Sequence, residues 1–399
     1  MDEGRTELDR LLAILRARES PFIHPLTAAF ERLRQPVHIQ VTGRARAGKT
    51  TLQRALALIS AEETAPIDAP DTPAPVLDAD IVLYVLSGTL HPADRIALAG
   101  ISPHEEDSGA VADDAIAAGP MSPSGRILLV LNKADAMGTG WADAVEAAQR
   151  WASELGVATF PVVASLAART RSGIVTEEDL ATLRRHLGQA DPAFGLVPER
   201  FTSPAIASDA PERRAVLEHW TLPGVACALA ALRHDRDLTS RQLSQILHAA
   251  SGIDPLHREL QRRYERITAT RGGEFLDELV RLAAADEEWP PYTANSRDRG
   301  AGAAGGMRAR GDADASDREL IARYLESDEA RALGLRAGLS SLGLPPPACG
   351  EPADAAAALA HATHWRAASD DLPPDARRAA LRVHDGYVRL WERMTDARL

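Results

Sequence analysis

The feature that most constrains this chain is a glycine-rich loop between a short strand and a helix. Val37–Val41 alternates apolar and polar residues as a strand does, and it leads into Gly43-Arg-Ala-Arg-Ala-Gly-Lys-Thr50, a GxxxxGKT pattern. Thr51–Ile59 follows with helical spacing. The backbone N–H groups of such a loop converge on phosphate oxygens, and the helix N-terminus favours their negative charge. The segment therefore predicts a phosphate-binding loop.

Within this loop each residue type has an expected role. Lys49 reaches the outer phosphates, and the Thr50 hydroxyl can bind Mg²⁺. Of the 45 basic residues only Lys49 and Lys133 are lysines, and a compact ammonium suits the bottom of a tight phosphate loop better than a guanidinium does. The residues predicted to contact the nucleotide here are Gly43, Arg44, Ala45, Arg46, Ala47, Gly48, Lys49, Thr50 and Thr51.

A second motif selects the base. Asn132-Lys-Ala-Asp135 directly follows the apolar run Ile127–Leu131 and fits the NKxD pattern of GTP-binding domains. The Asp135 carboxylate can accept both N1–H and N2–H of guanine, a donor pair that adenine lacks. Asn132 is expected to brace the loops, and the Lys133 stem can lie over the base. Ala164 and Ser165, after a further strand at Phe160–Ala164, occupy the place of the loop whose N–H meets guanine O6, although the serine is displaced.

The region after the phosphate loop departs from a regulatory GTPase. Such an enzyme needs a threonine and a DxxG carboxylate that reach Mg²⁺ and the γ-phosphate. The best match to DxxG is Asp68-Ala-Pro-Asp71, with aspartate in place of glycine, and only Ser60–Ile67 precedes it. Thr64 is the one threonine available there, and Asp68 is the expected outer-sphere magnesium ligand. The alternative is that Thr64–Pro75 is merely a proline-rich connection.

Arg46 is the candidate for charge stabilisation during hydrolysis. It fills the fourth position of the loop pattern, from which a guanidinium could reach the β- and γ-phosphates and act as an arginine finger within the same chain. The alternative is a solvated loop residue like Arg44. The candidate catalytic residues are thus Lys49, Arg46 and Asp68, and the candidate metal ligands are Thr50 and Asp68.

The chain of 399 residues is long enough for two domains. Strands separated by helical patterns predict an α/β P-loop GTPase domain with a doubly wound, mostly parallel sheet over residues 35–190. Helices in 1–34 are expected to pack on a helical domain, and the proline-containing residues 191–211 read as a linker. Residues 212–399 show only helix patterns, such as Asp317–Leu339, and predict an all-α bundle or stalk with a flexible Gly-rich segment at 287–316.

Composition narrows the partners and the compartment. The net charge of −12 does not attract the phosphates of nucleic acids, so no nucleic-acid partner is expected. Two cysteines without metal-ligand spacing and a charged N-terminus predict a cytoplasmic protein without a signal peptide. Thr221–Leu232 is too short for a membrane span. The Gly-rich segment lacks an apolar face, so any contact with the inner face of the membrane is expected to be peripheral and weak.

Several stretches together resemble a known family. They are Val41–Leu52, Asn132–Asp135, Trp220–Arg233, Ser251–Leu256 and Arg382–Trp391, and they are similar to bacterial dynamin-like GTPases of the actinobacterial, isoniazid-inducible type. The resemblance implies a GTPase head with a helical stalk, association as a homodimer or with a dynamin-like partner, and action on membranes in some members. The position of Arg46 also resembles that of the arginine in guanylate-binding proteins. The short switch region, Asp71 and the displaced Ser165 depart from the family.

Two functions are expected from these patterns. The first is slow GTP hydrolysis, with GTP/GDP and Mg²⁺ as ligands, coupled to self-association or partner binding. The second is a scaffold or regulator that holds nucleotide with negligible hydrolysis, its helical part being the working surface.

Overall fold

The computed structural model describes residues 6–69, 75–101, 123–138, 140–189, 191–284, 315–344 and 352–396. Among these residues the chain divides into two compact units, one formed by residues 38–263 and the other by residues 6–37 and 264–396. Asp71 and residues 287–314 of the predicted Gly-rich segment lie outside the described residues.

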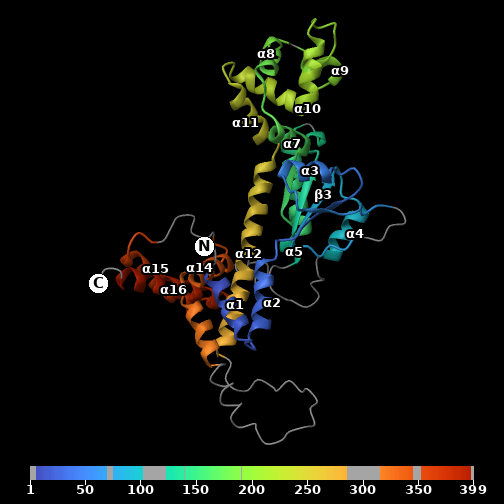
Figure 1. Ribbon diagram of the computed structural model, residues 1–399. Coiled ribbons are helices and arrows are strands. Elements are labelled where there is room, and N and C mark those ends of the chain that lie inside the picture. The colour runs from blue at the N-terminus through green and yellow to red at the C-terminus, as the bar shows by residue number, and fades with distance from the viewer. Residues whose placement is uncertain are drawn as a thin grey trace, which may run out of the picture. The chain divides into compact units, whose positions relative to one another are not determined.

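The first unit is built on a five-stranded parallel sheet (Figure 1). The strands are β1 Ile39–Gly43, β2 Glu62–Glu63, β3 Ile81–Ser87, β4 Ile127–Asn132 and β5 Thr159–Val162, in the order β2-β1-β3-β4-β5. All residues of β1 and β4 are buried, including the polar Gln40 and Thr42 of β1, as expected in a parallel sheet covered on both faces. The α/β architecture expected from the sequence is therefore present, and the carboxyl ends of β1, β3 and β4 lie side by side.

Helices connect these strands or follow the last of them. They are α3 Lys49–Leu56, α4 Pro92–Ile101, α5 Pro123–Arg126, α6 Trp141–Leu155, α7 Ala164–Ser172 and α8 Glu177–Arg185, with a short 3-10 turn η1 at Ala134–Ala136. Ala147 and Ala148 of α6 pack on Leu131 of β4, where small side chains allow a close approach of helix and sheet. Thr176 caps α8 by accepting a hydrogen bond from Asp179 N at 3.0 Å.

Residues 191–211 form ordered structure instead of the linker that the sequence predicts. They contain η2 Pro192–Gly195 and α9 Pro198–Phe201, and the rings of Phe194 and Phe201 are fully buried in one apolar cluster. The guanidinium of Arg213 is also fully buried and donates to the carbonyls of Phe201 and Ser203 at 2.5 and 2.9 Å. These anchors stabilise a segment whose prolines suggest a loose connection.

α10 Ala210–His234 and α11 Ser240–Ala250 complete this unit, packing with α7 and α8 (Figure 1). The sequence predicts a separate bundle from residue 212 onwards, whereas residues 210–263 belong to the sheet-containing unit. α10 is kinked at Thr221 (φ 63°), two residues before Pro223. In the described part of the chain it is the one helix long and apolar enough to cross a membrane by length and composition. Its apolar residues, such as Val225 and Leu229, pack in the core of the unit, which is compatible with a soluble protein.

The second unit is helical. Its helices are α1 Glu7–Ala17, α2 Ile23–Arg34, most of α12 Ile253–Ala284, a helix over 315–325, α14 Asp328–Ser341, α15 Ala355–Ser369 and α16 Pro374–Asp396. Leucines of α1 and α2 pack against Phe275 and Leu279 of α12. The sequence predicts one helix over Asp317–Leu339, but the chain breaks it at Ser327, whose side chain accepts from Ala330 N at 3.2 Å and starts α14.

Candidate functional site

The glycine-rich loop joins the end of β1 to the start of α3 and has no room for side chains at its two glycines. Gly43 has φ +140°, and a Cβ there would lie 2.3 Å from the carbonyl oxygen of Val85. Gly48 has φ +96°, and a Cβ would lie 2.2 Å from Nδ2 of Asn132. Both positions therefore require glycine.

Lys49 directs its side chain back over this loop. It is buried, with 6% of its surface exposed, and its Nζ donates to the carbonyl oxygens of Gly43 and Arg44, both at 3.3 Å. The ammonium is thus held inside the loop by backbone carbonyls alone. An ammonium held in a glycine loop between a strand and the start of a helix is an arrangement suited to binding phosphate.

Asn132 joins the three segments that the sequence analysis singled out. Its Nδ2 donates to the carbonyl oxygen of Ala47 in the loop at 2.9 Å, and its Oδ1 accepts from the N–H of Ala164 at 3.1 Å. Its neighbour Lys133, in the left-handed region at φ 58°, donates from Nζ to the carbonyl oxygen of Arg46 at 3.0 Å. The predicted phosphate loop, the Asn132–Asp135 motif and the start of α7 therefore form one site.

The two residues expected to face a base lie at the open side of this junction. Asp135 is exposed on η1, and Ser165 is exposed at the second position of α7. The sequence places both Ala164 and Ser165 near the base, but the N–H of Ala164 already donates to Asn132. Ser165 is in the first turn of the helix, where the backbone N–H has no intrahelical acceptor, so it is the better donor of the two.

Arg44 is fixed by a buried carboxylate that sequence reasoning missed. Its Nε donates to Asp94 Oδ2 at 3.1 Å and its Nη2 to the carbonyl oxygen of Thr89 at 3.3 Å. Asp94 is fully buried and also accepts from the Tyr84 hydroxyl at 2.9 Å and from the N–H of His91 at 2.8 Å. Burial, together with the charge of Asp94, raises the pKa of Tyr84 well above its usual range. Arg44 therefore anchors the loop to the segment after β3.

Arg46 differs from Arg44 in conformation and in contacts. Its backbone has φ +58°, a left-handed conformation that costs a non-glycine residue about 1–3 kcal/mol and persists only where the surrounding structure imposes it. The hydrogen bond from Lys133 to its carbonyl oxygen supplies such a constraint. The Arg46 side chain is exposed at the rim of the loop. The residue expected to contact phosphates is thus strained and solvent-accessible.

The segment after α3 passes along the outer side of β1 to the phosphate loop. The N–H groups of Thr64 and Ile67 donate to the carbonyl oxygens of Val41 and Gly43 at 3.1 and 3.3 Å. This path brings the Asp68 carboxylate within 2.8 Å of the N–H of Ala45, in the loop itself. The sequence proposes Asp68 for the magnesium site, and the structure brings its carboxylate to the backbone of the loop.

Thr64 does not face the loop opening. Its side chain is buried, with 7% of its surface exposed, and its hydroxyl donates to Thr42 Oγ1 at 2.8 Å within the sheet. In this conformation the hydroxyl is unavailable to a metal ion or a phosphate. The candidate switch threonine therefore directly follows β2, with its hydroxyl turned to β1.

Glu63 is a second acidic residue that the sequence analysis missed. It ends β2, and its Oε2 accepts a hydrogen bond from the Thr50 hydroxyl at 2.8 Å. β2 has only two residues, both exposed glutamates, so it carries no apolar strand signal. Thr50, Glu63 and Asp68 offer the oxygen donors that Mg²⁺ prefers. Within the described ranges no group of three His, Cys, Asp or Glu side chains is clustered for metal binding, so Mg²⁺ would need phosphate oxygens and water as further ligands.

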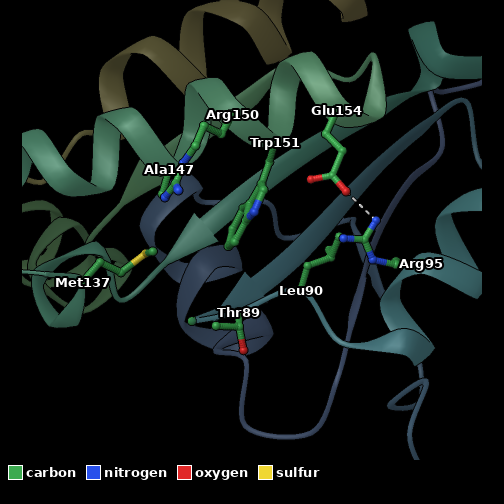
Figure 2. A pocket seen from close by; sticks show the side chains of 9 residues that line it. Thr89, Leu90, Arg95, Met137, Ala147, Arg150, Trp151 and Glu154 are labelled. Carbon is green, nitrogen blue, oxygen red and sulfur yellow. Dashed lines mark hydrogen bonds and ion pairs between the residues drawn. The ribbon is translucent and has the colours of Figure 1, made fainter.

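A cleft of about 350 Å³ lies beside this site (Figure 2). Figure 2 shows the Trp151 ring entering it from α6, with the exposed ion pair of Arg95 and Glu154 (2.5 Å) at one side. Thr89, whose carbonyl oxygen holds Arg44, and Met137, which follows the Asp135 turn, also line it. The cleft borders the loop junction on the α6 side.

In comparisons with known proteins, no family model, no curated protein and no solved structure matches this chain. The function is therefore argued from the residues and their geometry.

Proposed function

We propose that the sheet-containing unit binds a guanine nucleotide together with Mg²⁺ and hydrolyses GTP slowly. The observation that carries the proposal is the double hydrogen bond of Asn132, which links the phosphate loop to the start of α7. A glycine loop alone fits many nucleotides. The same side chain begins the Asn132–Asp135 motif and also holds the start of α7, which supports a single ligand that contacts the loop and the residues expected at the base.

The residues divide between phosphate, metal and base. Lys49 and the loop N–H groups would hold the phosphates, and the Thr50 hydroxyl would hold Mg²⁺, with Glu63 and Asp68 nearby. Mg²⁺, when bound, neutralises charge that develops on the transferred phosphate. Asp135 would accept the two guanine N–H groups, and the N–H of Ser165 would donate to O6. Arg46, exposed at the rim, would stabilise charge on the γ-phosphate from within the chain.

Slow turnover follows from the segment at β2. The Thr64 hydroxyl is bonded to Thr42, so the threonine that a regulatory GTPase uses to order its γ-phosphate and Mg²⁺ has no counterpart among the described residues of that segment. This observation also favours a second candidate, a scaffold that holds nucleotide with negligible hydrolysis.

The resemblance to dynamin-like proteins suggests what nucleotide binding would control in the cell. Nucleotide state would be coupled to self-association or to a dynamin-like partner through the helical unit, in the cytoplasm, with at most a peripheral membrane contact. A second copy of this chain is the simplest partner to test.

Single-turnover hydrolysis separates the two candidates. Purified protein in excess over radiolabelled GTP and Mg²⁺ should convert it to GDP, and Lys49→Ala should prevent both binding and conversion. Binding of GTP without conversion to GDP would support the scaffold and exclude the GTPase. If the wild-type protein fails to bind GTP or GDP, both candidates are wrong.

A further inference from the structure

Glu63 is not among the site residues that the sequence predicts, yet it touches the one hydroxyl expected to hold the metal. Its Oε2 lies 2.8 Å from Thr50 Oγ1, and Thr50 is the second residue of α3, directly after Lys49. A hydroxyl donates one hydrogen and keeps lone pairs for acceptance. Because Glu63 takes the hydrogen, the lone pairs of Thr50 are free to point to a cation.

We infer that Glu63 is the positioning residue that makes nucleotide binding by this protein conditional on a divalent cation. The inference deepens the proposed function and rests on it. Glu63 would act through Thr50: it orients the hydroxyl as a metal ligand and adds negative charge behind it. Partners of this kind behind a metal ligand typically change metal affinity by 10–100-fold.

The charge of Glu63 acts in opposite directions with and without the metal. Beside Mg²⁺, the carboxylate is attracted to the cation and supports the complex. Without Mg²⁺, the same carboxylate lies near the phosphates and repels them, because like charges within a few ångströms disfavour each other. The Asp68 carboxylate, 2.8 Å from the N–H of Ala45, adds to this repulsion. Removal of the Glu63 charge should thus weaken binding in Mg²⁺ and strengthen it in a chelator.

The chain offers a matched control in the preceding residue. Glu62 carries the same charge in the same two-residue strand, but its carboxylate contacts His38 Nε2 at 3.0 Å and Gln40 Nε2 at 3.1 Å. Successive strand residues point to opposite faces of a sheet, so Glu62 faces away from Thr50. A general effect of charge or of strand stability would appear equally in both positions.

The experiment measures GDP affinity of the full-length protein by calorimetry, once in magnesium chloride and once in EDTA. For Glu63→Gln, which keeps a hydrogen-bond acceptor for Thr50, the ratio of the two affinities should fall by about tenfold or more, with tighter binding in EDTA than wild type. Glu62→Gln should keep the wild-type ratio. In a Thr50→Val background, Glu63→Gln should change the ratio little, because the hydroxyl through which it acts is gone.

Four outcomes would overturn the inference. Wild-type affinities of Glu63→Gln in both solutions mean that the carboxylate does not act on the metal, although the proposed function stands. An equal loss of affinity in Mg²⁺ and in EDTA, or an equal effect of Glu62→Gln, means that β2 is only structural. If wild-type protein binds GDP under neither condition, the proposed function itself fails and this inference fails with it. Thermal unfolding without nucleotide reports whether each variant is folded.

Discussion

Replacement of Asn132 tests the junction on which the site depends. The side chain is 3% exposed and satisfies two buried backbone groups, the carbonyl oxygen of Ala47 and the N–H of Ala164. Asn132→Ala would leave both groups without their partner. Each unsatisfied buried group costs about 1–3 kcal/mol, so the total loss is about 2–6 kcal/mol. We expect this loss to divide between the free energy of unfolding and the free energy of nucleotide binding.

Two measurements separate these parts. Chemical unfolding without nucleotide gives the loss of stability, and the increase in melting temperature on addition of GDP gives the change in binding. We expect both the free energy of unfolding and the GDP-induced increase in melting temperature to fall. The Ala47 carbonyl belongs to the phosphate loop, and the Ala164 N–H belongs to the start of α7, where the base is expected. Asn132→Ala with wild-type stability and a wild-type GDP-induced shift would refute the view that this side chain holds the site together.

Three further predictions concern the loop, the α9–α10 region and the Gly-rich segment. Arg46→Ala should lower kcat for GTP at least tenfold, about 1.4 kcal/mol of barrier, and leave GDP affinity nearly unchanged; an unaltered single-turnover rate would exclude the arginine finger. Burial acts to raise the pKa of Asp209, but His186 and Arg213 outweigh it and hold that pKa below its ordinary value. The stability from Asp209 is therefore present above the ordinary pKa of about 4 and is lost as pH falls through the lowered value. Asp209→Asn should make the free energy of unfolding less dependent on pH in the acid range. It should also cost about 3 kcal/mol at neutral pH, because the buried guanidinium of Arg213 loses one partner. Deletion of 287–316 should leave the protein folded, and flotation with neutral vesicles should be negligible for both chains; binding that survives high salt would contradict a weak peripheral contact.

The parts of the site that were predictable from the sequence are those with a local pattern. The loop from Gly43 to Thr50 and the motif from Asn132 to Asp135 each carry their residue types at fixed spacing after a strand, so their proximity follows from the parallel sheet. The sequence also proposes Asp68 as a residue near Mg²⁺, but it does not predict the contact of this residue with the loop backbone. Its carboxylate reaches the N–H of Ala45 because the segment before it follows β1.

The contacts that were not predictable are made by residues without such a pattern. Asp94 lies 50 positions from Arg44 in the sequence, in the first turn of α4. Acidic residues are common in the first turn because they interact favourably with the helix dipole, so the sequence gives no sign of its contact with Arg44. Glu63 lies in a strand of two polar residues that has no alternation to recognise. The sequence predicts a linker at residues 191–211 because of their prolines. Phe194 and Phe201 hold this segment in place, but their burial depends on α10, which lies later in the chain.

Base selectivity tests the central claim most directly. Calorimetric titration of the wild-type protein in Mg²⁺ should give binding of GTP and GDP and little binding of ATP, because adenine lacks the two donors that Asp135 would accept. Asp135→Asn should lose about 2–4 kcal/mol of GTP affinity and shift preference toward xanthosine nucleotides. Equal binding of ATP and GTP by the wild type would contradict the account.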